Sequence, residues 1–120
     1  MAKILVVDDD IHATTLFKTL LTAKGFEAVV VNDSSTAVEI TKSTNPDLII
    51  LDLMMPEPNG FEVCKTLRAD TKYSQIPIVI FTAMGDNESR DAAFEAGADE
   101  FLTKPFRVED LMTRIKNLLE

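Results

Sequence analysis

The sequence predicts an α/β fold in which a five-stranded parallel sheet carries helices on both faces. Two observations lead to this prediction: five short runs of apolar, mostly β-branched residues, and stretches with helical apolar spacing that separate these runs. Continuous apolar runs of this length are typical of strands that are buried on both sides. Strands that alternate with helices favour a parallel sheet, because each crossover helix returns the chain to the same edge.

The predicted strands are Lys3–Val7, Glu27–Val31, Leu48–Leu51, Ile76–Phe81 and Glu100–Thr103. The first predicted helix runs from about Ile11 to Lys24 and stops at Gly25. Its apolar spacing predicts an inward face formed by Ile11, Leu16, Phe17, Leu20 and Leu21. The second helix is predicted over Ser34–Ser43, because Asp33 is a good N-cap and Asn45 and Pro46 end the pattern.

The other three helices are predicted from their caps and their apolar spacing. The third begins at Asn59, with Glu62 three residues later in an Asn variant of the capping box. The fourth follows Asp86 and ends at Gly97. The inward residues are Phe61, Cys64 and Leu67 in the third helix, and Val108, Leu111, Met112, Ile115, Leu118 and Leu119 in the fifth.

Length and composition predict one domain over residues 1–120. The chain has 120 residues, of which 46% are hydrophobic, which is enough for one core without disulfide or metal support. We expect no membrane span, because the longest apolar runs are far short of the roughly 20 residues that a spanning helix needs. A signal peptide is not expected either, since acidic residues follow the first apolar run. The single cysteine, Cys64, excludes an internal disulfide and favours a cytoplasmic location.

The net charge of −8 argues against binding of nucleic acid by this chain. Acidic, hydroxyl and basic side chains gather instead just after the predicted strands, together with an alanine and a proline. These residues are Asp8, Asp9 and Asp10 after the first strand, Asp52 after the third, Thr82 and Ala83 after the fourth, and Thr103, Lys104 and Pro105 at the end of the fifth. The carboxyl ends of parallel strands meet at one edge, where doubly wound sheets bind their ligands.

A cluster of carboxylates at that edge calls for a cation. Carboxylates about 4 Å apart repel by roughly 4 kcal/mol per pair at an effective dielectric constant near 20, so their pKa values rise or they recruit a positive charge. Oxygen ligands with room for water suit Mg²⁺. A carboxylate beside Mg²⁺ and a lysine can attack a phosphoryl group, because both cations neutralise the charge on the transferring oxygens. The sequence therefore predicts a phosphoryl-handling site with an aspartate nucleophile.

Four stretches of the chain make the interpretation more specific: KILVVDDD, PDLIILDLMMPEPNG, IPIVIFTA and GADEFLTKPF. In this order and spacing they make the chain resemble a response-regulator receiver domain of two-component and chemotaxis signalling over essentially its whole length. The resemblance implies a flavodoxin-like sheet with strand order 2-1-3-4-5. It also implies a switch that accepts a phosphoryl group and turns over no metabolite.

The resemblance implies a role for each residue of the site. Asp52 would take the phosphoryl group from a kinase phosphohistidine, Asp9 would bind Mg²⁺ directly, and Asp8 would act on the metal largely through water. Met54 would offer its backbone carbonyl to the metal, and Lys104 would pair with the phosphoryl oxygens. The peptide bond before Pro105 would be cis.

Two further residues would couple the phosphoryl group to the surface. Thr82 would move to bind it, together with a backbone amide near Ala83, and Phe101 would turn into the space that Thr82 leaves. Met54 and Met84, as flexible apolar side chains beside the site, predict a slow-to-moderate loss of the phosphoryl group.

The expected partners are a sensor histidine kinase or phosphotransfer protein and a downstream effector protein or domain. A homodimer is expected on phosphorylation, with ion pairs of Arg90 with Asp110 and of Glu100 with Arg114 between two copies. Exposed pairs of this kind contribute about 0–1 kcal/mol each, so exchange between monomer and dimer is expected.

Other interpretations stay open at this point. The three consecutive aspartates could simply cap the first helix. A phosphatase with an aspartyl-phosphate intermediate needs a second acid two residues after the nucleophile, where this chain has Met54. A nucleotide-binding module is disfavoured, since neither GxGxxG nor GxxxxGK[ST] occurs. A receiver that acts only as a scaffold is disfavoured because every expected site residue is present.

Overall fold

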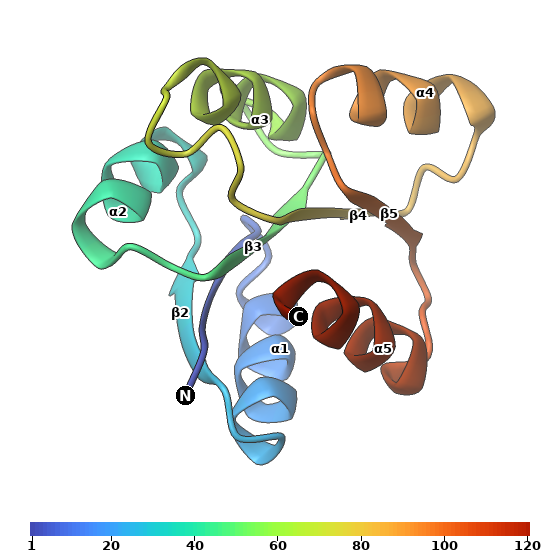
Figure 1. The fold of residues 1–120 in the computed structure, drawn as a ribbon. Helices are drawn as coiled ribbons and strands as arrows, with labels where there is room; N and C mark the ends of the chain where they lie inside the picture. The colour runs from blue at the N-terminus through green and yellow to red at the C-terminus, as the bar shows by residue number, and fades with distance from the viewer.

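The computed structural model describes residues 1–120 and contains one five-stranded parallel sheet with helices on both faces (Figure 1). The strands are β1 (Lys3–Val7), β2 (Glu27–Val31), β3 (Leu48–Asp52), β4 (Ile78–Thr82) and β5 (Glu100–Thr103). The helices are α1 (Ile11–Ala23), the 3₁₀ turn η1 (Ser34–Thr36), α2 (Ala37–Thr44), α3 (Gly60–Ala69), α4 (Asn87–Glu95) and α5 (Val108–Leu119). The strand order β2-β1-β3-β4-β5 confirms the predicted fold.

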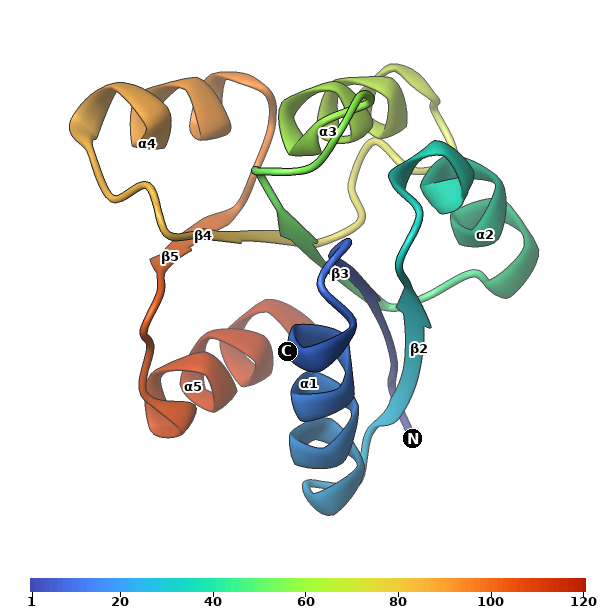
Figure 2. The same ribbon diagram turned by 180° about the vertical axis from the view of Figure 1, so that it is seen from behind.

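Two hydrophobic clusters, one on each side of the sheet, form the core. On one side α2, α3 and α4 pack on the sheet, and on the other side α1 and α5 do so (Figures 1 and 2). Strand β1 serves both clusters, since Leu5 and Val7 belong to the first and Ile4 and Val6 to the second. This alternation explains why the strands are continuous apolar runs, because each residue faces one of two covered surfaces. None of the helices combines the length and the apolar character that crossing a bilayer requires.

The inward face of α1 differs from the prediction. Phe17 and Leu21 are buried as expected, but Ile11 and Leu16 are 64% and 56% exposed. The buried position in the first half of the helix is instead Thr14, three residues before Phe17 and seven before Leu21. That spacing is the stripe of a helix with period 3.6, so Leu16 falls outside it. A threonine can occupy this inward position because its hydroxyl is hydrogen bonded, as described below.

Three predicted boundaries also shift by a few residues. The segment predicted as the start of the second helix is the 3₁₀ turn η1, because the Asp33 side chain accepts the Ser35 amide and tightens the first turn. Strand β4 begins at Ile78, two residues later than predicted, and Pro77 contributes only a carbonyl, which accepts from the Ile49 amide. Helix α4 ends at Glu95. The Asn59 capping box of α3 is present as predicted.

Candidate functional site

Three carboxylates lie together where β1 and β3 end. The two strands are neighbours in register, with Val7 beside Leu51, so Asp8 and Asp52 follow side by side. Asp8 is fully buried, Asp52 is 4% exposed, and Asp9 is exposed. Each of the three offers a carboxylate oxygen, and these oxygens all lie within 4.8 Å of one another. The edge therefore concentrates negative charge around two buried groups and one open one.

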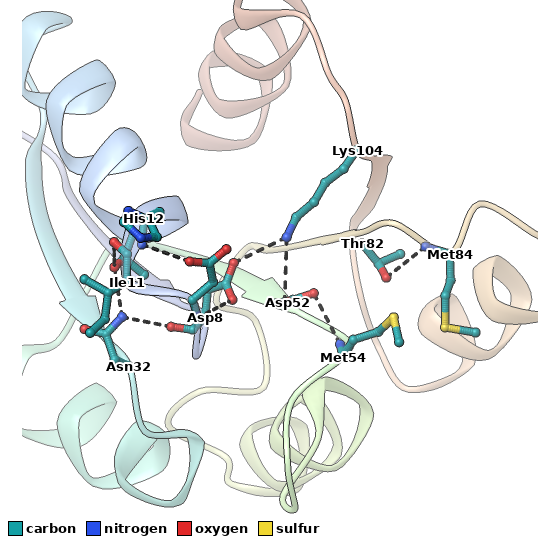
Figure 3. A network of polar contacts seen from close by, with 11 residues as sticks. Asp8, Ile11, His12, Asn32, Asp52, Met54, Thr82, Met84 and Lys104 are labelled. Atoms are coloured by element: carbon teal, nitrogen blue, oxygen red, sulfur yellow. Dashed lines mark hydrogen bonds and ion pairs between the residues drawn. The ribbon is translucent and has the colours of Figure 1, made fainter.

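Lys104 reaches the two buried carboxylates from the loop after β5 (Figure 3). Its Nζ lies 3.4 Å from Asp8 Oδ2 and 3.9 Å from Asp52 Oδ2. The same ammonium lies 4.6 Å from the centre of the Phe81 ring, where a cation is favourable. One ammonium does not balance three carboxylates, so the site as a whole remains negative.

The surroundings of Asp52 raise its pKa from 3.8 to about 6. The largest cause is burial, which penalises the charged form, and the second is the negative charge of Asp8. The Met54 amide, which donates to Asp52 Oδ1 at 3.2 Å, and the Lys104 ammonium act in the opposite direction. A divalent cation would favour the ionised carboxylate that a nucleophile needs.

The donor set fits such a cation. All three groups are hard oxygen ligands, and Asp9 on the exposed side leaves room for the water molecules that Mg²⁺ retains. The third aspartate of the run, Asp10, has another role: its side chain accepts the His12 amide and caps α1, while its own amide donates to Asp8 Oδ1 at 3.0 Å. The capping interpretation therefore applies to Asp10.

Thr82 and Lys104 meet on the other side of Asp52. Thr82 is fully buried, its Oγ1 accepts the Met84 amide at 3.1 Å, and its carbonyl accepts the Lys104 amide at 2.8 Å. The Lys104–Pro105 peptide bond is cis, and so is Glu57–Pro58, which the sequence did not predict. Phe101 is half-buried and packs against the cluster beneath α3 and α4, while Ala83 is exposed.

The four residues predicted at a dimer interface lie outside this acidic edge. Arg90, Asp110 and Arg114 line a pocket of about 380 Å³ that also includes Phe101. Glu100 forms an ion pair with Arg114 of the same chain. Arg90 lies over the Phe94 ring, 5.8 Å from its centre.

Sequence reasoning missed two polar residues beside the site, Asn32 and Ser34. The Asn32 side chain donates to the Asp8 carbonyl, and the Ser34 hydroxyl donates to the Pro56 carbonyl. Neither follows a predicted strand in a recognisable motif. Their one signal is that they lie in the short segment that follows β2, the strand next to β1.

Comparisons with known proteins agree with this geometry. A family model described as the response regulator receiver domain matches residues 4–116. The DNA-binding dual master transcriptional regulator RpaA of Synechocystis is 38% identical over 119 residues, which cover 99% of this chain and 49% of that protein. The chain spans about half the length of the curated relatives that it matches first.

Solved structures show the same fold. The chemotaxis protein CheY4 of Vibrio cholerae is 32% identical with a TM-score of 0.93, and the match covers 99% of each chain. The BeF3-activated receiver domain of Klebsiella pneumoniae RstA is 30% identical with a TM-score of 0.92, and that match covers 98% of each chain.

Proposed function

The chain belongs to the response regulator receiver domains of two-component signalling, and from this premise we propose that Asp52 is its phosphoacceptor. A phosphoryl group would pass from a phosphohistidine of a sensor kinase or phosphotransfer protein to an Asp52 oxygen. The bond between the imidazole nitrogen and phosphorus breaks as the bond between the Asp52 oxygen and phosphorus forms. We propose that residues 1–120 form this one phosphoacceptor unit.

The observation that carries the proposal is the position of the Asp52 carboxylate between other charged groups. It lies 3.9 Å from the Lys104 ammonium, and its oxygen is within 4.8 Å of those of Asp8 and Asp9. Lys104 would pair with the phosphoryl oxygens once they replace its present carboxylate contacts.

Asp8, Asp9, Asp52 and the Met54 carbonyl would hold Mg²⁺, as the family resemblance implies. When bound, Mg²⁺ supplies positive charge to the oxygens of the transferring group. Asp9, as the exposed ligand, would bind the ion directly, whereas the buried Asp8 would act largely through water. Asp8 already has two other contacts, with the Asp10 amide and with Lys104.

Thr82 and Phe101 would carry the change to the surface. The Thr82 hydroxyl, which now accepts the Met84 amide, would turn to donate to the phosphoryl oxygens together with an amide near Ala83. Phe101, packed at the same side of the sheet, would move into the vacated space. Hydrogen bonds to charged groups contribute about 1.5–3 kcal/mol each, so a few of them reach the roughly 5.5 kcal/mol that moves a switch from 1:99 to 99:1.

The two methionines beside the site predict how long the phosphoryl group lasts. Met54 and Met84 are 55% and 42% exposed and offer no group that orients water. We expect slow-to-moderate dephosphorylation, measured by following the phosphorylated protein after removal of the donor. Hydrolysis as fast as in chemotaxis regulators would contradict this expectation.

The face formed by α4, β5 and α5 would bind the output partner or a second copy. The curated relatives include DNA-binding regulators of about twice this length, so the proposed effector is a DNA-binding one, and the acidic receiver itself would not touch nucleic acid. A dimer would use Arg90 with Asp110, and it would have to exchange the Glu100–Arg114 pair present within one chain. Light scattering with and without beryllofluoride tests this, and a monomer in both conditions would reject it. A cytoplasmic location remains our prediction.

Intact mass after incubation with Mg²⁺ and acetyl phosphate tests the central proposal. The wild-type chain should gain one phosphoryl group, and neither Asp52→Asn nor a sample with excess chelator should gain it. A gain by Asp52→Asn would show that another residue is the nucleophile. No gain by the wild type, together with no binding of Mg²⁺ or beryllofluoride, would leave only a scaffold.

A further inference from the structure

We propose that Asn32 and Ser34 are positioning residues that hold the two loops of the acidic site from outside. Asn32 would fix the loop that carries Asp8 and Asp9, and Ser34 would fix the loop that follows Asp52. The role in metal binding rests on the function proposed above, whereas the positioning itself does not.

The backbone of Asp8 is hydrogen bonded at both its amide and its carbonyl, and Asn32 supplies the bond to the carbonyl. The Asp8 amide donates to the Val31 carbonyl at 3.0 Å, as a continuation of the β1–β2 pairing. The Asp8 carbonyl then accepts from Asn32 Nδ2 at 3.0 Å (Figure 3). No backbone amide donates to this carbonyl, so the Asn32 side chain supplies its partner and extends the fixed backbone by one residue.

The second proton of the same amide group reaches α1. Asn32 Nδ2 also donates to Thr14 Oγ1 at 2.8 Å, and that hydroxyl donates to the Ile11 carbonyl at 3.1 Å. Thr14 is 1% exposed whereas Asn32 is exposed, so this chain of bonds runs from the surface at the end of β2 to the buried first turn of α1. The loop from Asp8 to Asp10 is therefore held at its start and at its helical end by one side chain.

Ser34 does the same for the loop after β3. It is 5% exposed, and its Oγ donates to the Pro56 carbonyl at 3.0 Å. The far end of that loop is held at Gly60, whose amide donates to the Leu53 carbonyl at 3.3 Å and which lies too close to the Asp52 carbonyl oxygen for a Cβ to fit. Met54, whose amide donates to Asp52, lies between the end of β3 and Pro56.

A fixed backbone matters here because the carboxylates repel one another. Without a cation the three carboxylates would lower their repulsion energy by moving apart. The hydrogen bonds of Asn32 and Ser34 to the two loops resist that movement. Groups that orient ligands from outside the metal's own contacts typically alter metal affinity by about 10- to 100-fold. We therefore expect Asn32→Ala and Ser34→Ala each to weaken Mg²⁺ binding by about tenfold.

The experiment compares hydrogen exchange of two backbone amides in Mg²⁺-free protein by NMR. Asn32→Ala should accelerate exchange at the Asp10 amide, which bonds Asp8, by about fivefold and leave Met54 unchanged. Ser34→Ala should accelerate exchange at the Met54 amide and leave Asp10 unchanged. Asn117→Ala, an exposed residue of α5, is the matched control and should alter neither. Mg²⁺ titrations of the same four proteins then give the affinities.

Each outcome decides a separate point. Exchange that stays within about twofold of the wild type at both amides would overturn the proposal, and so would equal acceleration at both, since that indicates general loosening. Unchanged Mg²⁺ affinity in both variants, when the wild type binds the ion, would also overturn it. A wild type that binds no Mg²⁺ but shows the expected exchange pattern in its variants would reject the proposed function and support the positioning role.

Discussion

The two edges of the sheet differ in how completely their charged side chains are paired. At the carboxyl edge, Asp8, Asp9 and Asp52 face a single ammonium, and the pKa of Asp52 is raised by burial and by Asp8. At the amino edge of β4 and β5, Arg68 and Asp99 form an ion pair at 2.8 Å in which each partner also satisfies backbone groups. Negative charge is in excess at the first edge and balanced at the second.

Arg68 shows how complete that balance is. Its guanidinium donates to the carbonyls of Tyr73, Ile76 and Gly97, and Asp99 accepts the Ile78 amide as well as the Arg68 donor. Helix α3, the segment before β4 and the turn before β5 thus meet at one side chain. The comparison teaches that the paired charges of one edge stabilise the fold, whereas the excess of carboxylates at the other edge favours binding of a cation.

The largest expected effect comes from breaking the balanced edge. Arg68→Ala removes one hydrogen-bond donor from each of three carbonyls and from Asp99, so we expect a loss of about 3 kcal/mol in the free energy of unfolding, measured with urea. Arg107→Ala is the matched control, because the Arg107–Glu109 pair is more than 80% exposed on both sides and should contribute little. Equal effects of the two substitutions would contradict the contrast between the edges.

A smaller effect of opposite sign is expected at the acidic edge. Asp52→Asn removes a carboxylate whose pKa is about 6 in the folded chain against 3.8 as its ordinary value, so in chelator at pH 7 we expect stabilisation by about 2 kcal/mol. Between pH 6 and 4 the folded wild type takes up a proton that the unfolded chain does not. Its stability therefore rises as the pH falls through this window, and the advantage of Asp52→Asn disappears.

Urea unfolding at pH 7 and near pH 4 measures both parts of this expectation. Asp91→Asn, an exposed residue of α4, is the control for loss of one negative charge. A destabilising Asp52→Asn at pH 7 would mean that Lys104 more than compensates the buried charge.

The smallest effect should come from Mg²⁺ itself. At a concentration ten times its dissociation constant the ion should stabilise the wild type by about 1.4 kcal/mol, and chelator should remove this gain. Asp9→Asn should lose most of the gain, while Arg68→Ala should keep it, because the balanced edge is remote from the ion. A thermal melt of each protein with and without Mg²⁺ checks this, and a gain retained by Asp9→Asn would count against the proposed ligand set.

The sequence predicted the strands and the site edge well because both depend on local pattern and topology. The rule that parallel strands end at one edge brought Asp8, Asp52 and Lys104 together in the prediction, and the structure places them within hydrogen-bond or ion-pair distance. Each of these residues directly follows or ends a strand. A strand is recognised by its own residues, so this part needs no knowledge of distant contacts.

The features that sequence reasoning missed depend on distant contacts. Arg68 bonds carbonyls of residues 73, 76 and 97, and a guanidinium on a helix gives no sign of which loops will reach it. Thr14 takes the inward position predicted for Leu16 because its hydroxyl is satisfied there: it accepts a hydrogen bond from the side-chain amide of Asn32, 18 residues away. Polar partners of this kind are visible only after the chain has folded.

The position of Lys104 has a consequence for how the molecule is made. Lys104 and Asp8 are 96 residues apart in the sequence, so all three aspartates are synthesised well before the lysine that pairs with two of them. Because β4 lies between β3 and β5, the lysine arrives only after the last strand has joined the sheet. A nascent chain that has not yet added β5 therefore lacks the lysine of this acidic edge, and we expect reactivity towards a phosphoryl donor only after β5 has been made.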